Sequence, residues 1–243
     1  MRIETLSIEQ THWQLAGQRL IEMTLAEFLY EKIISLQALG EGQYQLAIDG
    51  LVYQFSAQQQ LLGHWLIQPG SVRIQGQSTP AWDLNQLIVA IARSVEVKPF
   101  TLAYLVKEMN NTWLAEAHLF NPQRPSSQAL IDLPAAEIEG ALRGHPWLVM
   151  SKGRLGFGYQ DYRDFAPEMQ TSQALFWVAV HNDLAAFNGT AEWSTEQLYA
   201  HELSATQRQQ FAQQISSRGF NPVHYYLLPV HPWQWHQWLV STY

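Results

Sequence analysis

The spacing of apolar residues changes period along this chain, and this change constrains the fold more than any other feature. Over residues 7–37 apolar side chains recur at helical spacing, which indicates a helical hairpin or one interrupted helix. Short strand-like runs follow at residues 44–48, 51–55, 63–68 and 72–75. Asp49-Gly50 separates the first two runs and is typical of a type I′ hairpin turn. The N-terminal part therefore predicts a helical region followed by an antiparallel meander.

Helical patterns return after this meander. The expected helices are residues 82–95, 101–119, 134–142 and 194–217. The last of them is expected as one long helix with Ser194 as its N-cap. Residues 174–180 have the composition of a buried strand. This order of elements predicts an α+β fold in which helices surround small antiparallel sheets.

A break between two of these helices suggests a domain boundary. Asn121-Pro122 and Pro125-Ser126-Ser127 interrupt the chain there. We expect two domains, residues 1–133 and residues 134–243. The alternative is that the break is an internal loop of one domain.

The composition excludes several classes of protein. The 243 residues include 14 Lys and Arg against 21 Asp and Glu, a net charge of -7, so a nucleic-acid partner is not expected. The chain has no cysteine, which excludes a thiol nucleophile, a thiolate metal site and disulfides, and suits a reducing compartment. Neither a signal peptide nor a run of about 18 apolar residues is recognisable. We therefore expect a cytoplasmic protein with no membrane partner.

Cations gather in one glycine-rich stretch of this acidic chain, from Gly144 to Glu168. In or beside it lie the cations Arg143, Lys152, Arg154 and Arg163 and the glycines Gly144, Gly153, Gly156 and Gly158. Glycines let a backbone approach a ligand closely, and clustered cations suit a phosphate or carboxylate. The stretch predicts a loop that holds such an anion. The alternative is a glycine-rich hairpin with ordinary surface charges.

Three side chains of this stretch are candidates for contact with the anion. Proline after His145 favours an extended backbone, and the imidazole is suited either to donate a hydrogen bond to the anion or to a structural role. In a strand, Lys152 and Arg154 would share a face and repel each other unless an anion lay between them; a solvated face is the alternative. No Walker A, Rossmann or nucleophile-elbow motif is present, so any catalysis would rest on positioning and electrostatics.

A second candidate cluster, His231-Pro232-Trp233-Gln234-Trp235-His236, lies near the C-terminus. From Gly219 to Tyr243 there is no charged residue besides histidine, so this segment should be packed within its domain or against further protein. His231, His236 and His224 are poorly spaced for a metal and lack carboxylate neighbours, so no metal site is predicted. The tryptophans suit a core or an interface, or a carbohydrate-binding surface.

Two long motifs resemble those of the NRPS-independent siderophore synthetases, the aerobactin-synthetase family. The signature loop of that family resembles, in order, Gly144-His145-Pro146, Lys152-Gly153-Arg154-Leu155-Gly156-Phe157-Gly158, Asp161-Tyr162 and Ala166-Pro167-Glu168. Its second motif resembles Leu228-Pro229-Val230-His231-Pro232-Trp233-Gln234. Many members carry a second His-Pro pair shortly after the first, where this chain reads Trp-Leu-Val-Met at residues 147–150. That departure resembles the branch that makes desferrioxamine, alcaligin, putrebactin and bisucaberin.

The resemblance implies an ATP-dependent, AMP-forming ligase. ATP, with Mg²⁺, adenylates a carboxylate, pyrophosphate leaves, and an amine attacks to form an amide. In the branch named, the acid is that of an N-hydroxy-N-succinyl diamine rather than citrate, and condensation ends in macrocyclisation. The implied catalytic residue is His145, and the implied nucleotide-binding residues are Gly144, His145, Lys152, Arg154, His231 and Gln234. A non-catalytic domain that binds a small anion or carboxylate, or a regulatory domain, is the alternative function.

The resemblance also implies that more protein belongs to this chain. Family members are longer and are described as a hand with thumb, fingers and palm. The chain is expected to hold the thumb and the beginning of the fingers, with the missing C-terminal half of the same protein as its partner and a homodimer as the complete form. We therefore expect residues 1–243 alone not to form an amide.

Overall fold

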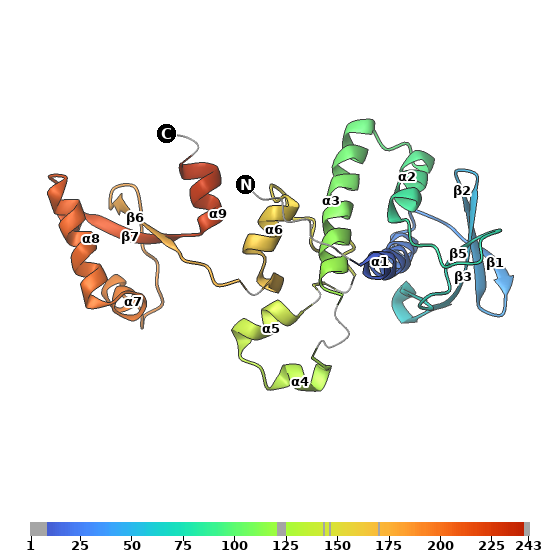
Figure 1. Ribbon diagram of the computed structural model, residues 1–243, viewed down its shortest axis with the longest axis horizontal. Helices are drawn as coiled ribbons and strands as arrows, with labels where there is room; N and C mark the ends of the chain where they lie inside the picture. The colour runs from blue at the N-terminus through green and yellow to red at the C-terminus, as the bar shows by residue number, and fades with distance from the viewer. Residues whose placement is uncertain (1–8, 121–124, 143, 146, 170, 241–243) are drawn as a thin grey trace. The chain divides into compact units, whose positions relative to one another are not determined.

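The computed structural model describes residues 9–120, 125–142, 144–145, 147–169 and 171–240 (Figure 1). The chain divides into two compact units, Met1–Thr171 (unit 1) and Ser172–Tyr243 (unit 2). Helices and small antiparallel sheets make up both units, which confirms the predicted α+β class. Within the described ranges, no helix is long and apolar enough to cross a membrane.

Unit 1 begins with one uninterrupted helix, α1 (Gln10–Tyr30), where the sequence left open a hairpin or a broken helix. The chain then enters β1 (Gln37–Gly40), a strand that the apolar pattern did not predict because all four residues are exposed. The rest of the meander was predicted, and consists of β2 (Gln43–Ile48), β3 (Leu51–Gln59), β4 (Trp65–Ile67) and β5 (Arg73–Ile74). Between β3 and β4 lies a short turn of 3-10 helix, η1 (Leu61–Gly63).

The sheet of unit 1 is antiparallel throughout, in the order β1-β2-β3-β4, with β5 also paired to β3. Asp49 and Gly50 have φ values of 46° and 76°, so the β2–β3 hairpin has the predicted type I′ turn. In this register Tyr53 lies opposite Leu46, and Phe55 lies opposite Tyr44. Tyr53 and Phe55 are both buried, and each buried aromatic side chain contributes about 2 kcal/mol to folding.

Two further helices complete the core of unit 1. They are α2 (Leu84–Ser94), capped by the side chain of Asp83, and α3 (Pro99–His118), which begins with proline. Both pack against α1 (Figure 1). Gly17 of α1 allows this close approach, because a Cβ atom there would clash with the carbonyl oxygen of Trp82.

The remaining elements of unit 1 are four short pieces of helix: α4 (Ser127–Ile131), α5 (Ala135–Ala141), α6 (Tyr159–Phe165) and η2 (Pro167–Met169). Among them α6 packs on α3, and α5 packs on η2. Because α6 joins this region to α3 of the N-terminal core, residues 135–169 belong to unit 1, and the chain divides at residues 171/172 rather than at the expected boundary of 133/134.

Unit 2 is a two-stranded antiparallel sheet with helices in the connection between its strands. β6 (Phe176–His181) pairs along its whole length with β7 (Tyr225–Val230). The predicted single helix over 194–217 is wrong: α7 (Thr195–Glu202) and α8 (Ala205–Ser217) are separate. Ser204 forms a capping box with Gln207 and starts the second helix. A short 3-10 turn, η3 (Pro222–His224), leads into β7. After β7 come α9 (Pro232–Gln234) and a π-helical turn, η4 (Trp235–Leu239).

Candidate functional site

The stretch between α5 and α6, which we call the signature loop (residues 144–158), consists of turns. The Ser151 amide donates to the Leu148 carbonyl at 3.1 Å, and the Gly153 amide donates to Met150 at 2.9 Å. Neither the strand considered for Lys152 and Arg154 nor the hairpin alternative is present in the described part of the loop. The structural reason is that the loop packs on α3, where Gly153 approaches Glu108 so closely that a Cβ atom would lie 3.0 Å from its carbonyl oxygen.

The ammonium group of Lys152 lies inside the protein. Its side chain has no exposed surface, and Nζ lies 3.4 Å from Oε1 of Glu168 and 3.7 Å from Oε1 of Glu116. Gly144 adopts a φ of 95° above it, and a Cβ atom at this position would lie 3.3 Å from Nζ. The structure thus brings Gly144 and Lys152 together, and the glycine is needed for space and for backbone conformation.

Arg154 lies at the edge of the same cluster, with 32% of its side chain exposed. Its Nη2 donates to both carboxylate oxygens of Glu168, at 3.0 and 3.1 Å. The guanidinium also lies over the ring of Tyr162, 5.6 Å from the centroid. The anion that the sequence required between Lys152 and Arg154 is therefore present within the protein, and it is the carboxylate of Glu168.

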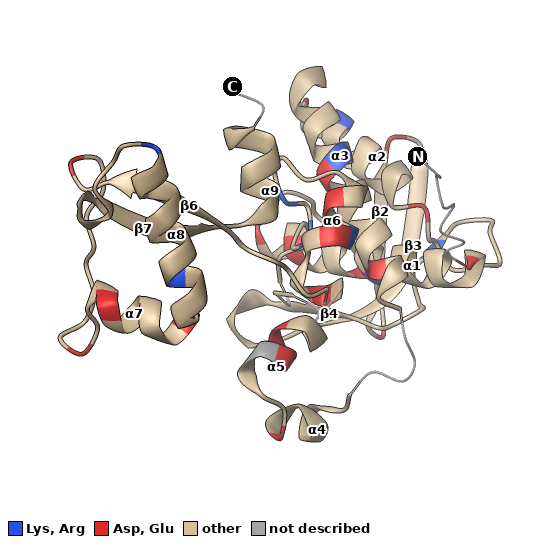
Figure 2. Cartoon of the chain, turned by 60° about the vertical axis from the view of Figure 1, so that its left-hand side comes forward, with Lys and Arg blue, Asp and Glu red and all other residues tan. Residues whose placement is uncertain are grey.

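The cluster carries more positive than negative charge. Arg19 of α1 joins it through Glu116, with Nε 3.6 Å from Oε2, so in the ion pairs between described residues three cations face two carboxylates. Figure 2 shows acidic and basic residues close together at α3 and α6. Nη1 of Arg154 is buried and makes no hydrogen bond to a described residue. An excess cation with a buried donor suits an additional anion.

The carboxyl group of Glu168 is held in its charged form. Burial alone would raise its pKa, but hydrogen bonds from its own backbone and from Arg154, with the charges of Arg154 and Lys152, lower the pKa below its usual value. Glu168 therefore acts as a permanent anion near neutral pH. Sequence reasoning missed Glu116 and Glu168 as members of the candidate site. Glu168 is the last residue of the glycine-rich stretch that begins at Gly144, but neither spacing nor composition shows that it pairs with Lys152.

His145 is exposed and lies next to Gly144 in the signature loop. Its Nδ1 accepts a hydrogen bond from the backbone amide of Trp147 at 3.2 Å. In neutral His145 the proton then resides on Nε2, which is left to donate to a ligand. Arg143 and Pro146 lie outside the described residues.

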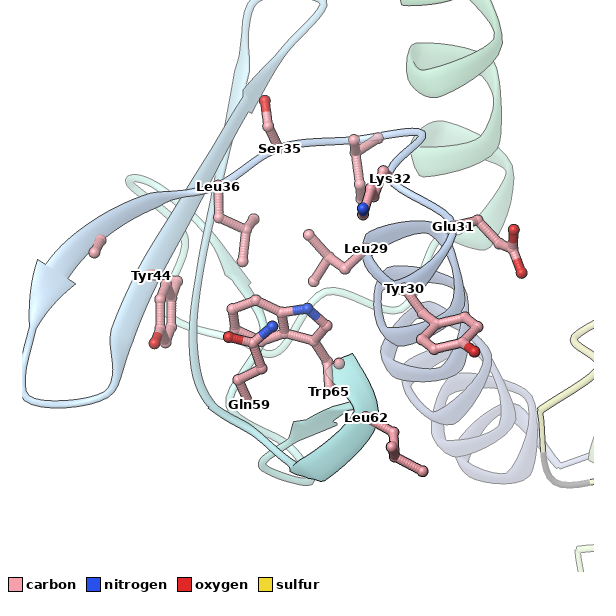
Figure 3. A pocket seen from close by; sticks show the side chains of 13 residues that line it. Leu29, Tyr30, Glu31, Lys32, Ser35, Leu36, Tyr44, Gln59, Leu62 and Trp65 are labelled. Carbon is pink, nitrogen blue, oxygen red and sulfur yellow. The ribbon is translucent and has the colours of Figure 1, made fainter.

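Trp147 leads from the signature loop towards the end of α1. Its ring stacks on His64 at 4.6 Å, and His64 stacks on Tyr30 at 4.4 Å. Tyr30 borders a cavity of about 910 Å³, into which the side chains of Leu29 and Trp65 project (Figure 3). None of the six predicted site residues lines this cavity, so it is separate from the anion cluster.

The second motif lies in unit 2. Nδ1 of half-buried His231 accepts from the Trp233 amide at 3.1 Å and caps α9, and Gln234 is exposed on α9. The rings of Trp233 and Trp238 are tilted by 54°, so they do not form the coplanar pair expected of a carbohydrate platform. Within the described part of the chain, no three His, Asp or Glu side chains are grouped so as to hold a metal ion. Of the predicted residues, Gly144, His145, Lys152 and Arg154 lie in unit 1, and His231 and Gln234 lie in unit 2.

Comparison with known proteins agrees with the fold and with the family that the sequence resembles. The chain is 31% identical over 230 residues to the rhizobactin siderophore biosynthesis protein RhbF of Rhizobium meliloti, covering 94% of this chain and 38% of that protein. It is 33% identical over 239 residues to the putrebactin synthase of Shewanella, covering 96% and 38%. The chain thus spans about two fifths of the length of these curated relatives.

A solved structure has the same fold. The aerobactin synthetase IucC from Klebsiella pneumoniae superposes with a TM-score of 0.84 at 26% identity, covering 96% of this chain and 42% of that one. Residues 134–243, which include the whole signature loop and the whole second motif, match the IucA / IucC family. This chain therefore belongs to the IucA / IucC family, and the relatives that it matches are siderophore biosynthesis proteins and siderophore synthetases.

Proposed function

We propose that this chain is the N-terminal part of an ATP-dependent siderophore synthetase that adenylates a carboxylate and joins it to an amine as an amide. The observation that carries the proposal is the cluster of the signature loop, in which a partly exposed Arg154 belongs to a group of described residues with three cations and two carboxylates. A phosphate or a carboxylate would balance the third cation. Support for ATP comes from a protein of the same fold, the aerobactin synthetase IucA of Klebsiella pneumoniae, which was solved bound to ATP (TM-score 0.54, 18% identity).

The proposed roles follow the chemistry of each group. Arg154 and the Nε2 of His145 would donate to phosphate or carboxylate oxygens as negative charge develops on them, and His145 is the candidate catalytic residue. Gly144 would let the ligand approach the backbone, and Lys152 contributes charge to the cluster. His231 and Gln234 of unit 2 are also proposed as nucleotide-binding residues. Mg²⁺ would accompany ATP, with ligands from beyond the described residues.

The proposed substrate is an N-hydroxy-N-succinyl diamine. Where many relatives have a second His-Pro pair, this chain presents Trp147 and Leu148, which are 50% and 46% exposed. An apolar surface on the signature loop suits an acyl chain with a single carboxylate better than the three carboxylates of citrate. Similarity to a putrebactin synthase supports this choice. We place the reaction in the cytoplasm, where ATP is available, and propose a homodimer for the complete protein.

The proposal is tested by ATP–pyrophosphate exchange and amide formation with N-hydroxy-N-succinyl diamines, for the complete protein and for residues 1–243. We expect exchange by the complete protein and none by residues 1–243. Absence of exchange by the complete protein with any acid substrate would reject the ligase. In that case calorimetric binding of ATP, citrate or succinate by residues 1–243 would favour the alternative, a domain that only binds small anions.

A further inference from the structure

We infer that Glu168 is a positioning residue, which acts through Arg154 on the bound anion, and that Lys152 anchors Glu168 from inside the protein without touching the ligand. This inference rests on the proposed function, because it divides the roles within the same site. It separates two cations that the sequence presents as equivalent members of one motif.

The first step concerns Lys152, which cannot reach a ligand in this conformation. Its side chain is fully buried, and Gly144 lies over its ammonium group. Moving Nζ to a ligand would take one counter-charge away from each of the nearly buried carboxylates of Glu116 and Glu168, which are 8% and 7% exposed. Removing one partner from a buried ion pair is far more costly than losing a surface pair. Lys152 is therefore held inside the protein, where it stabilises the signature loop through Glu116 and Glu168.

The second step concerns Arg154, which is held on two sides and has 32% of its side chain exposed. Glu168 accepts two hydrogen bonds from Nη2, and the ring of Tyr162 lies against the guanidinium plane. A charged group fixed before the ligand arrives loses little freedom on binding, which favours both affinity and correct orientation. Without Glu168, a long and partly exposed side chain would sample several rotamers.

The third step concerns Glu168, which links three parts of unit 1. It lies on η2, pairs with Lys152 and Arg154 of the signature loop, and shares Lys152 with Glu116 of α3. The carboxylate is thus fixed by the fold before it fixes Arg154. Its lowered pKa agrees with this arrangement, since it stays charged as the loop requires.

The test is a double-mutant cycle in the complete protein, with KM for ATP and kcat measured in amide formation. Glu168→Gln keeps an oxygen that accepts from Arg154 but removes the charge, and is expected to raise KM for ATP about tenfold, the effect of losing one charge-assisted hydrogen bond. Arg154→Gln is expected to raise KM at least as much. The double variant should match Arg154→Gln alone, because Glu168 acts through Arg154. Effects that multiply would overturn the inference.

Lys152→Met supplies the second arm. It removes the charge and keeps most of the buried volume. We expect a lower melting temperature and a rise in KM for ATP of the folded fraction that is smaller than that of Glu168→Gln, because Glu168 loses its anchor while Arg154 keeps its hydrogen bonds to Glu168. A rise as large as that of Arg154→Gln would show that Lys152 touches the ligand and would overturn the role assigned to it. Glu139→Gln, an exposed change on α5, is the matched control and should alter neither quantity.

A spectroscopic arm does not depend on activity and can use residues 1–243. The guanidinium N–H signals of Arg154 in ¹H–¹⁵N spectra should be protected from exchange in the native chain and lost in Glu168→Gln. If they are unprotected in the native chain, the positioning contact is absent and the inference fails. If they are protected but the complete protein forms no amide, the proposed function fails while the contact between Glu168 and Arg154 stands.

Discussion

The two units bury apolar surface to very different extents. Unit 1 encloses a continuous core between α1, α2, α3 and its sheet, with Leu25 and Leu87 fully buried. In the described part of unit 2, the buried aliphatic side chains are Leu203 and Leu227, whereas Val223 is 74% exposed. A two-stranded sheet with so little core is only marginally stable by itself. The signature loop therefore lies on a well-packed unit, and the second motif lies on a weakly packed one.

The largest effect is expected from Phe55→Ala in the core of unit 1. Phe55 is 2% exposed, and truncating a buried phenylalanine costs about 3–5 kcal/mol of the free energy of unfolding, because a cavity remains. Urea unfolding followed by amide exchange should show earlier unfolding of α1 and β3 with no change in β6 and β7. Phe100→Ala, where the ring is 74% exposed, is the control. Simultaneous earlier unfolding of both units would contradict the comparison and show one cooperative structure.

Lys152→Ala is expected to cost almost as much, about 3 kcal/mol, because it leaves Glu116 and Glu168 as buried carboxylates short of a counter-charge. Arg154→Ala should cost less, about 1 kcal/mol, since the guanidinium is one-third exposed. Denaturant unfolding measures both. Lys107→Ala, an exposed change on α3, provides the baseline. Equal effects of the Lys152 and Lys107 variants would mean that Lys152 is solvated and that unit 1 lacks this buried anchor.

The stability of unit 1 should depend on pH through Glu168. Because the pKa of Glu168 is lowered in the folded state, its contribution is complete above the unfolded pKa of about 4.3 and is lost as pH falls through the folded pKa. Burial raises the pKa of Glu22, so Glu22 has the opposite effect on the pH dependence of stability. Because Glu22 is present both in the native chain and in Glu168→Gln, its effect cancels when the two are compared. The difference in melting temperature between the native chain and this variant should shrink between pH 5 and 2. A constant difference would show that charge on Glu168 is not what stabilises the loop.

The sequence predicted the elements of unit 1 better than those of unit 2, for a physical reason. The β2–β3 hairpin and α2 have a clear apolar face and local turn or cap residues, so their periodicity is strong. In α7 and α8 the exposed, glutamine-rich surface has no periodicity that would mark the break at Leu203 and Ser204. The capping box of Ser204 and Gln207 is the one local sequence signal that indicates the start of α8.

The site was only half predictable from sequence. The motifs identify Gly144, Lys152 and Arg154, and the structure places them in one cluster. The sequence could not show that Lys152 is buried, because its burial depends on Glu116 of α3, 36 positions away, and on Glu168. Long-range pairing of this kind leaves no periodic signal. Motif membership therefore predicts which residues lie together, while burial distinguishes the enclosed Lys152 from the partly exposed Arg154.

The smallest effect, that of Val223→Ala, sharpens the comparison most directly, because the same substitution can be made at a buried valine of unit 1. Val72 of unit 1 is 2% exposed and Val223 of unit 2 is 74% exposed. Removing two buried methyl groups in Val72→Ala should cost about 2 kcal/mol, whereas Val223→Ala should stay within about 0.5 kcal/mol, because its methyl groups already contact water. Chemical denaturation of residues 1–243 gives both values. A cost of Val223→Ala approaching that of Val72→Ala would mean that the surface around η3 is covered in solution, for example by a second copy of the chain, and this cost would then depend on protein concentration.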